Sequence, residues 1–113
     1  MIKIYHNPRC TKSRQGLELL ETSRKSFEVI KYLENPLTFD ELKNIIELLD
    51  MKPMDLVRKN ESIWKTNYKD KNLSSTEVIH AMIENPKLIE RPIVINGNKA
   101  VIGRPTEEIL SIL

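Results

Sequence analysis

The sequence is short of the residues that would place it in several protein classes. It has one cysteine, which excludes an internal disulfide and a cysteine-rich metal site. No hydrophobic run approaches the roughly 18 residues of a membrane span, and the segment 1–6 lacks the apolar stretch of a signal peptide. Eighteen Lys and Arg face sixteen Asp and Glu, so the net charge of +2 does not favour a nucleic-acid-binding protein. We therefore expect a cytoplasmic protein that binds neither nucleic acid nor membrane.

What remains is the composition of an ordinary globular protein. Hydrophobic residues make up 40% of the 113 positions, enough for a packed core, and charged residues make up 30%, as on a water-exposed surface. A chain of this length suits one core. We expect a single domain over residues 1–113, and a monomer by default.

The first third of the chain has the pattern of a strand, a helix and a second strand. Residues 2–6 alternate and include β-branched and aromatic types, and residues 27–33 form a second run of this kind. Between them, Thr11 to about Thr22 has helical periodicity, with Leu17 and Leu20 on one face. Such a unit predicts two parallel strands joined by a right-handed crossover.

Helices are expected in the middle of the chain. Thr38 with Glu41, and Ser74 with Glu77, have the spacing of capping boxes at two helix starts. The buried stripe of the first helix is predicted at Leu42, Ile45, Ile46 and Leu49. We predict a short helix over 54–59, a loop or partial helix over 63–73, and a helix from 74 to about 84 that Asn85-Pro86 ends.

The last part of the chain predicts a hairpin and a closing helix. Residues 92–96 form a strand, Asn96-Gly97-Asn98 a tight turn, and residues 99–102 the returning strand. The final helix follows, with its inner face predicted at Ile109, Leu110 and Leu113. The fold class is therefore α/β: a thioredoxin-like layout with a four-stranded mixed sheet and a helical insertion at about 38–84.

Cys10 is the main candidate functional residue, because it stands between the first strand and the first helix. A helix start has unpaired N–H groups and a partial positive charge, which stabilise a thiolate and can cradle an oxyanion. Arg9, Lys12 and Arg14 add positive potential. The alternative is a cysteine packed as a small hydrophobic residue. The polar neighbours favour a reactive thiol.

Ser13 and His6 are further candidates whose roles the residues alone leave open. Ser13 stands where a dithiol enzyme has its second cysteine; it can hydrogen-bond a thiolate or an oxyanion, or be an ordinary first-turn residue. His6 is either a strand-end histidine or a group near the thiol. A metal site built from His6, Cys10 and the distant His80 has little support, so we predict no metal.

Three segments resemble a known family. Residues 6–14 (His-Asn-Pro-Arg-Cys-Thr-Lys-Ser-Arg), 91–94 (Arg-Pro-Ile-Val) and 103–105 (Gly-Arg-Pro) are similar to segments of the glutaredoxin-coupled arsenate reductases, the ArsC family, and occur in the same order. The resemblance implies that Cys10 is the catalytic nucleophile and that His6 tunes it.

The same resemblance implies a set of oxyanion-binding arginines. These are Arg91 and Arg104, with Arg58 as a third member in a less distinctive segment. Arginine suits this role, since its planar fork can give two hydrogen bonds to an oxyanion and it stays charged. We also predict a cis Arg91-Pro92 bond, because a cis-proline faces the active-site cysteine in thioredoxin-like folds.

The activity that the resemblance implies is an oxidoreductase of arsenic detoxification, which reduces arsenate to arsenite. Two electrons are needed and this chain has one thiol, so the second thiol comes from outside; the resemblance names glutathione as the reductant and glutaredoxin as the resolving partner, with no bound cofactor. Two alternatives stay open: a glutathione-linked oxidoreductase with another substrate, and a regulator that binds RNA polymerase. Ser13 disfavours the second, because it breaks the Cys-x-x-Cys pair of such a redox switch.

Overall fold

The computed structural model describes residues 1–113, and the chain divides into two compact units. The first unit joins Met1–Asn35 with Arg91–Leu113, and the second is Pro36–Glu90. The expectation that residues 1–113 form one domain stays a prediction. None of the helices is long and apolar enough to cross a membrane.

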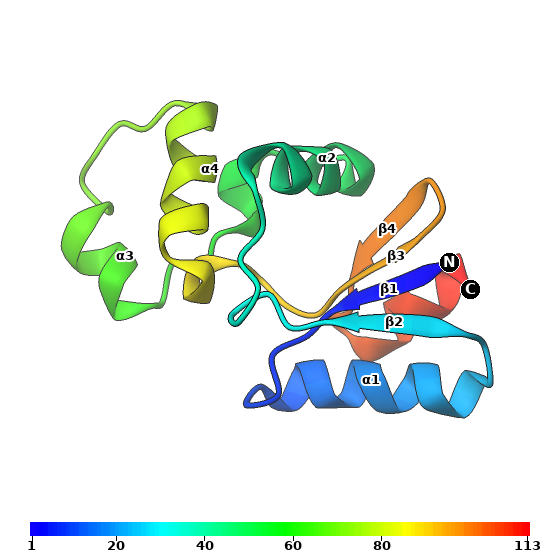
Figure 1. Cartoon of the computed structure of the whole chain (residues 1–113). Coiled ribbons are helices and arrows are strands. Elements are labelled where there is room, and N and C mark those ends of the chain that lie inside the picture. Colours follow the sequence, from blue (N-terminus) through cyan, green and yellow to red (C-terminus); the bar gives the residue numbers. More distant parts are fainter. The chain divides into compact units, whose positions relative to one another are not determined.

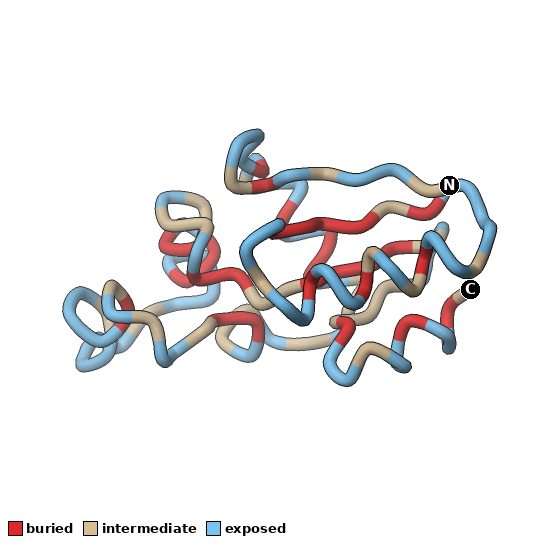
Figure 2. The backbone as a smooth tube through the Cα atoms, turned by 90° about the horizontal axis from the view of Figure 1, so that it is seen from below, coloured by how far each residue is buried: buried red, intermediate tan, exposed pale blue.

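The first unit is built on the predicted four-stranded mixed sheet (Figure 1). Its elements are β1 (Ile2–Tyr5), α1 (Thr11–Ser23), β2 (Phe27–Ile30), β3 (Ile93–Asn96), β4 (Lys99–Ile102) and the 3₁₀ helix η3 (Thr106–Ile112). The strand order is β2-β1-β3-β4, with β2 parallel and β3 antiparallel to β1, and β4 antiparallel to β3. In Figure 2 the central strands β1 and β3 run almost wholly through buried positions. The α/β, thioredoxin-like fold class is confirmed.

Helices α1 and η3 pack together against the sheet of this unit (Figure 1). The core between them consists of six buried residues: Ile2, Ile4, Leu20, Val94, Ile109 and Ile112. Gly16 lies in the middle of α1 because a Cβ there would stand 2.9 Å from Pro92 Cγ and 3.2 Å from Ile109 Cδ1. The glycine therefore allows α1 to approach the start of β3 closely.

The closing helix differs from its prediction in its buried face. Ile109 is buried as expected, but Leu110 is 58% exposed and Ile112 is buried in its place. The element is a 3₁₀ helix with three residues per turn, so residues three apart share a face. The expected inner position of Leu110 is therefore wrong.

The predicted hairpin of β3 and β4 is confirmed, whereas strand β2, which is not part of it, is shorter than predicted. Strand β3 ends at Asn96 and β4 begins at Lys99, with Gly97 in the left-handed region at φ 64°. Strand β2 ends at Ile30 rather than at Leu33, because the N–H groups of Glu34 and Asn35 bond to the Lys31 carbonyl and form a turn.

The second unit is helical, as the sequence predicts. Its elements are α2 (Phe39–Leu49), the 3₁₀ helix η1 (Pro53–Leu56), α3 (Ser62–Asn67), α4 (Ser75–Glu84) and the 3₁₀ helix η2 (Pro86–Leu88). Both capping boxes are present, at Thr38 with Glu41 and at Ser74 with Glu77. In α2 three of the four predicted stripe residues are buried and Leu49 is half-buried.

The short helix predicted over 54–59 is wrong in its second half. The 3₁₀ helix η1 ends at Leu56, and Val57 then forms an antiparallel bridge with Ile89. The Arg58 N–H donates to the Leu88 carbonyl at 2.7 Å, and the Glu90 N–H donates to the Leu56 carbonyl at 2.9 Å. This extended pairing occupies the Arg58 N–H and the Leu56 carbonyl, which a continuing helix would need for its own hydrogen bonds.

Candidate active site

The loop between β1 and α1 is held by Asn7. Its carbonyl accepts the Cys10 N–H at 3.0 Å, and its side-chain Oδ1 accepts the Arg9 N–H at 3.0 Å. Pro8 follows Asn7 and fixes the backbone angle that a turn needs, while asparagine commonly bonds to the backbone two residues on. Asn7 is itself buried. The short sequence Asn-Pro-Arg-Cys thus folds into a tight turn that ends at the cysteine.

Cys10 is the N-cap residue of α1. Its backbone is extended (φ −96°, ψ 123°), and its carbonyl accepts the first helical bond, from the Arg14 N–H, at 3.0 Å. Its side chain makes no capping hydrogen bond, and no acidic residue lies in the first turn of the helix. The thiol is free and partly exposed. The positive end of α1 is therefore open next to a sulfur that reagents can reach.

Several donors lower the pKa of the Cys10 thiol below its ordinary value. Burial acts in the opposite direction and is the largest single influence, but the other groups together outweigh it. These are the Ser13 N–H, the Arg91 side chain and the Lys12 N–H, all of which favour the thiolate. A lowered pKa agrees with the prediction of a reactive thiol at Cys10, which stays a prediction.

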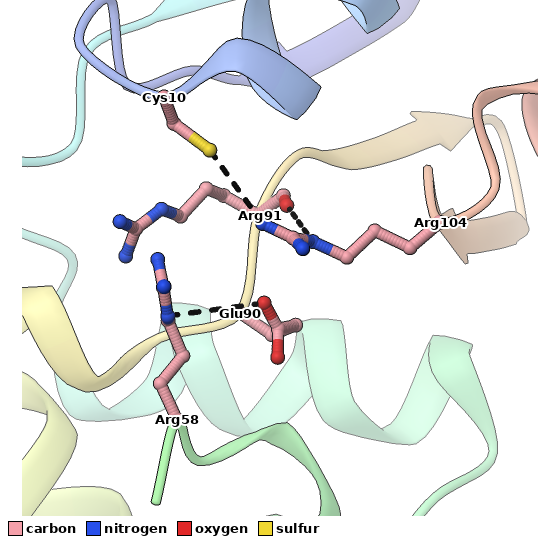
Figure 3. Close-up of polar contacts among 5 residues, drawn as sticks. All are labelled: Cys10, Arg58, Glu90, Arg91 and Arg104. Carbon is pink, nitrogen blue, oxygen red and sulfur yellow. Dashed lines mark hydrogen bonds and ion pairs between the residues drawn. The ribbon is translucent and has the colours of Figure 1, made fainter. Parts of the chain in front are cut away.

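Arg104 contacts the sulfur directly (Figure 3). Its Nη2 lies 3.5 Å from Cys10 Sγ, and its Nε donates to the Arg91 carbonyl at 2.8 Å. One arginine thus contacts the sulfur, while the other, Arg91, lowers the pKa of the thiol. The hydrogen bond from Arg104 Nε to the Arg91 carbonyl holds the Arg104 guanidinium in place beside Cys10.

Sheet register explains why these three residues meet. Tyr5 pairs with Ile93, and Ile93 pairs with Ile102, so the end of β1, the start of β3 and the end of β4 lie at one edge of the sheet. The Cys10 loop follows β1, Arg91 precedes β3 and Arg104 follows β4. The Arg91-Pro92 bond is cis as predicted, and Arg104-Pro105 is cis as well, which the sequence analysis did not consider.

His6 and Ser13 form a buried pair beneath the loop. His6 Nδ1 lies 2.7 Å from Ser13 Oγ, which also accepts the Asn7 N–H at 2.9 Å. Burial, followed by the positive charge of Lys31, lowers the pKa of His6, and a hydrogen bond with Ser13 offsets this in part. Burial therefore favours the neutral form of His6 more than in a free histidine.

The position of Ser13 refines its expected role. The sequence analysis predicted that its hydroxyl could bond a thiolate or an oxyanion, but the hydroxyl is fully buried and occupied by His6 and Asn7. It is the backbone N–H of Ser13 that favours the thiolate. The side chain organises the loop.

Arg14 has contacts that sequence reasoning missed. Its Nη1 donates to the Pro8 carbonyl at 2.9 Å, and its Nη2 donates to Thr11 Oγ1 at 3.1 Å. From the sequence, Arg14 was expected only as one of three positive charges near Cys10. The spacing from Pro8, six residues earlier, gives no signal of such a bridge.

Arg58 belongs to the second unit, where its Nε lies 4.0 Å from Glu90 Oε1 (Figure 3). Its backbone is held by the extended pairing with residues 88–90. Its membership of an oxyanion site stays a prediction. No group of three or more His, Cys, Asp or Glu side chains is placed to hold a metal ion.

This arrangement places a thiol of lowered pKa at an open helix start, with guanidinium groups beside it. A thiolate can attack an electrophilic centre, and helix N–H groups with arginines can bind the oxygens around that centre. The site in the first unit therefore has the parts needed for nucleophilic attack on an oxyanion.

Comparison with known proteins gives consistent matches over the whole chain. The model of the ArsC family matches residues 5–112. The chain is 46% identical over 114 residues to the "Uncharacterized protein YfgD" of Escherichia coli, covering 99% of this chain and 96% of that protein. It is 41% identical over 114 residues to the "Arsenate reductase" of Neisseria meningitidis serogroup B, covering 99% and 97%.

Two solved structures have the same fold as this chain. The structure described as "Arsenate reductase from Vibrio cholerae" superposes with a TM-score of 0.94 at 44% identity, covering 99% of this chain and 97% of that one. The "Putative arsenate reductase from Yersinia pestis" superposes with a TM-score of 0.93 at 45% identity, covering 99% and 100%.

Proposed function

The chain belongs to the ArsC family, and on that premise we propose that it reduces arsenate to arsenite with Cys10 as the nucleophile. The observation that carries the proposal is the lowered pKa of the Cys10 thiol beside Arg104, at the open start of α1. The names of the Neisseria and Vibrio relatives support the choice of substrate.

Binding of arsenate is the first step of the proposed reaction. The Arg91 and Arg104 guanidinium groups and the first N–H groups of α1 hold the arsenate oxygens; a role for Arg58, in the second unit, is implied by the family resemblance alone. These donors orient arsenic toward the Cys10 sulfur. They also neutralise charge on the oxygens in the transition state, which removes the largest barrier to attack by an anion on an anion.

The covalent step forms one bond and breaks one. The Cys10 thiolate attacks arsenic, an S–As bond forms, and one arsenate oxygen leaves as hydroxide or water. His6, bonded to Ser13, keeps the loop in the conformation from which the sulfur attacks.

The redox step needs a thiol that this chain lacks. A glutathione thiolate attacks the Cys10 sulfur of the adduct, an S–S bond forms, and the electron pair of the S–As bond passes to arsenic, which leaves as arsenite. Arsenic gains two electrons, and two thiols are oxidised to one mixed disulfide. A glutaredoxin thiol then attacks that disulfide and releases the Cys10 thiolate. Because the cycle consumes reduced thiols, we place it in the cytoplasm.

The test is an arsenate-reduction assay with glutathione and glutaredoxin, in which wild type is compared with Cys10→Ser and each thiol component is omitted in turn. We expect turnover only with wild type and both components. Omission of glutaredoxin should leave a glutathione adduct on Cys10 that intact-mass spectrometry detects. Turnover that survives in Cys10→Ser would remove Cys10 from the mechanism.

The same assay separates the proposal from a related activity. If Cys10 of the wild-type protein undergoes thiol–disulfide exchange with glutathione and glutaredoxin, but arsenate is not reduced, the protein is an oxidoreductase with another substrate. Inorganic phosphate, a close analogue of arsenate without its redox chemistry, serves as the matched control for occupancy of the anion site.

A further inference from the structure

Arg14 bridges the two sides of Cys10 along the chain. Its guanidinium donates to the Pro8 carbonyl, in the turn before Cys10, and to the Thr11 hydroxyl, in the residue after it. Its own backbone N–H donates to the Cys10 carbonyl. Three hydrogen bonds from one residue therefore surround the nucleophile, and none of them uses the sulfur.

The bridge complements the buried contacts on the inner side of the same loop. There, Ser13 Oγ binds the Asn7 N–H within the protein interior. Both Arg14 side-chain bonds lie on the exposed side of the loop. The turn centred on Asn7 supports the same half of the loop through backbone donors, the Cys10 and Arg9 N–H groups.

We propose that Arg14 is a positioning residue, whose guanidinium clamps the Pro8–Thr11 segment so that Cys10 keeps its place at the start of α1. The inference rests on the proposed function only in taking Cys10 as the nucleophile. Arginine is suited to the role because its planar fork reaches two acceptors in fixed directions. A lysine keeps the charge but has a single ammonium group.

The charge of Arg14 and its hydrogen-bond geometry should affect the pKa values of different residues. The groups that lower the pKa of Cys10 are the Ser13 N–H, Arg91 and the Lys12 N–H, and Arg14 is not among them. Its charge acts instead on His6, whose pKa it helps to lower. The other charges near the thiol are Arg104, which contacts Sγ, and the neighbouring Arg9 and Lys12. An effect of Arg14 on Cys10 therefore passes through the shape of the loop, whereas its effect on His6 is electrostatic.

The experiment compares Arg14→Lys and Arg14→Gln with wild type, with Arg9→Gln as the matched control. Arg9→Gln removes an equal charge from the same loop, but the bond of Arg9 to Asn7 comes from its backbone and is kept. The pKa of Cys10 is measured from the pH dependence of alkylation by iodoacetamide, and that of His6 by proton NMR. Circular dichroism and thermal melting establish that each variant is folded.

We expect both Arg14 variants to raise the pKa of Cys10 by roughly half a unit to one unit, about the weight of one hydrogen bond, and Arg9→Gln to raise it less. Only Arg14→Gln should raise the pKa of His6. In the arsenate assay, kcat should fall about 3- to 10-fold for both Arg14 variants, with a smaller change in KM, because orientation of the nucleophile is lost.

Two results overturn the proposal. An Arg14→Lys protein with the Cys10 pKa of wild type means that charge suffices, and an unchanged pKa in both variants means that the clamp has no effect on the thiol. Thr11→Val, which removes one acceptor, is the second test: it should shift the Cys10 pKa in the same direction by less, and Thr11→Ser should restore it. Alkylation needs no arsenate, so these outcomes stand even if the proposed reduction fails.

Discussion

The starts of α1 and α4 differ in how their first N–H groups are used. Helix α4 begins with a closed capping box: Ser74 Oγ accepts the Glu77 N–H at 3.2 Å, and Glu77 Oε1 accepts the Ser74 N–H at 2.9 Å. Helix α1 begins at Cys10, with no capping hydrogen bond and no acidic residue in its first turn. Arginines lie beside it instead.

The difference separates a helix start that serves stability from one that serves chemistry. A capping box satisfies two of the N–H groups at a helix start permanently and contributes about 1 kcal/mol. A thiolate or a bound oxyanion can use the same groups only where no side chain occupies them. Helix α2, which Thr38 and Glu41 close in the same way as α4, agrees with this division: both capped starts lie in the helical second unit.

The largest expected effect comes from converting the open start into a capped one. Cys10→Ser should abolish arsenate reduction and raise the free energy of unfolding by about 1 kcal/mol, because serine is a good N-cap residue. Urea unfolding and the reduction assay measure the two quantities. Cys10→Ala is the control: it should lose the activity without the gain in stability. Equal stabilities of the two variants would contradict this view of the α1 start.

Removal of the guanidinium groups should have the next largest effect. Arg104→Gln and Arg91→Gln should each lower kcat/KM for arsenate by about 10²-fold, the usual cost of one transition-state donor. Arg91→Gln should also raise the pKa of Cys10, since the Arg91 side chain lowers it. Steady-state kinetics and the pH dependence of thiol alkylation check these outcomes. An unchanged alkylation profile for Arg91→Gln would show that the helix N–H groups and Arg104 hold the thiolate without Arg91.

Opening the capped starts should affect stability alone. Thr38→Ala and Ser74→Ala each remove one side-chain acceptor and should lower the free energy of unfolding by about 1 kcal/mol. Neither should alter the rate of Cys10 alkylation. Urea unfolding provides the first measurement and iodoacetamide kinetics the second. A slower alkylation in either variant would break the proposed division between the two kinds of helix start.

The smallest effect concerns His6 and pH. Its pKa is lowered in the folded protein, so below the ordinary value of 6.5 the unfolded chain binds more protons. Stability should therefore fall as the pH drops from 6.5 through the folded pKa, and the His6 contribution should be fully present above that range. In His6→Gln this part of the pH dependence should disappear. Urea unfolding at several pH values measures it, and parallel curves for the two proteins would refute it.

Local features were predictable because their causes lie within a few residues. Both capping boxes, the turn at Gly97 and the helix after Cys10 depend on neighbouring side chains and on backbone preference. The expectation for Leu110 failed because it assumed 3.6 residues per turn, whereas packing of η3 gave three. The short helix over 54–59 failed because residues 88–90 supply competing backbone partners.

In the candidate site, too, some features could be predicted from the sequence and others could not. The sequence by itself determined Cys10 as a thiol at a helix start, since strand, turn and helix are consecutive there. The resemblance, not periodicity, pointed to Arg91 and Arg104, and only the register of β1, β3 and β4 decided that both reach the thiol. The contacts of Ser13 and Arg14 lie within residues 6–14, but the sequence did not indicate them, because they depend on the exact shape of the turn. The partners of Arg91 and Arg104 depend on where the backbone folds back, which no short stretch of sequence encodes.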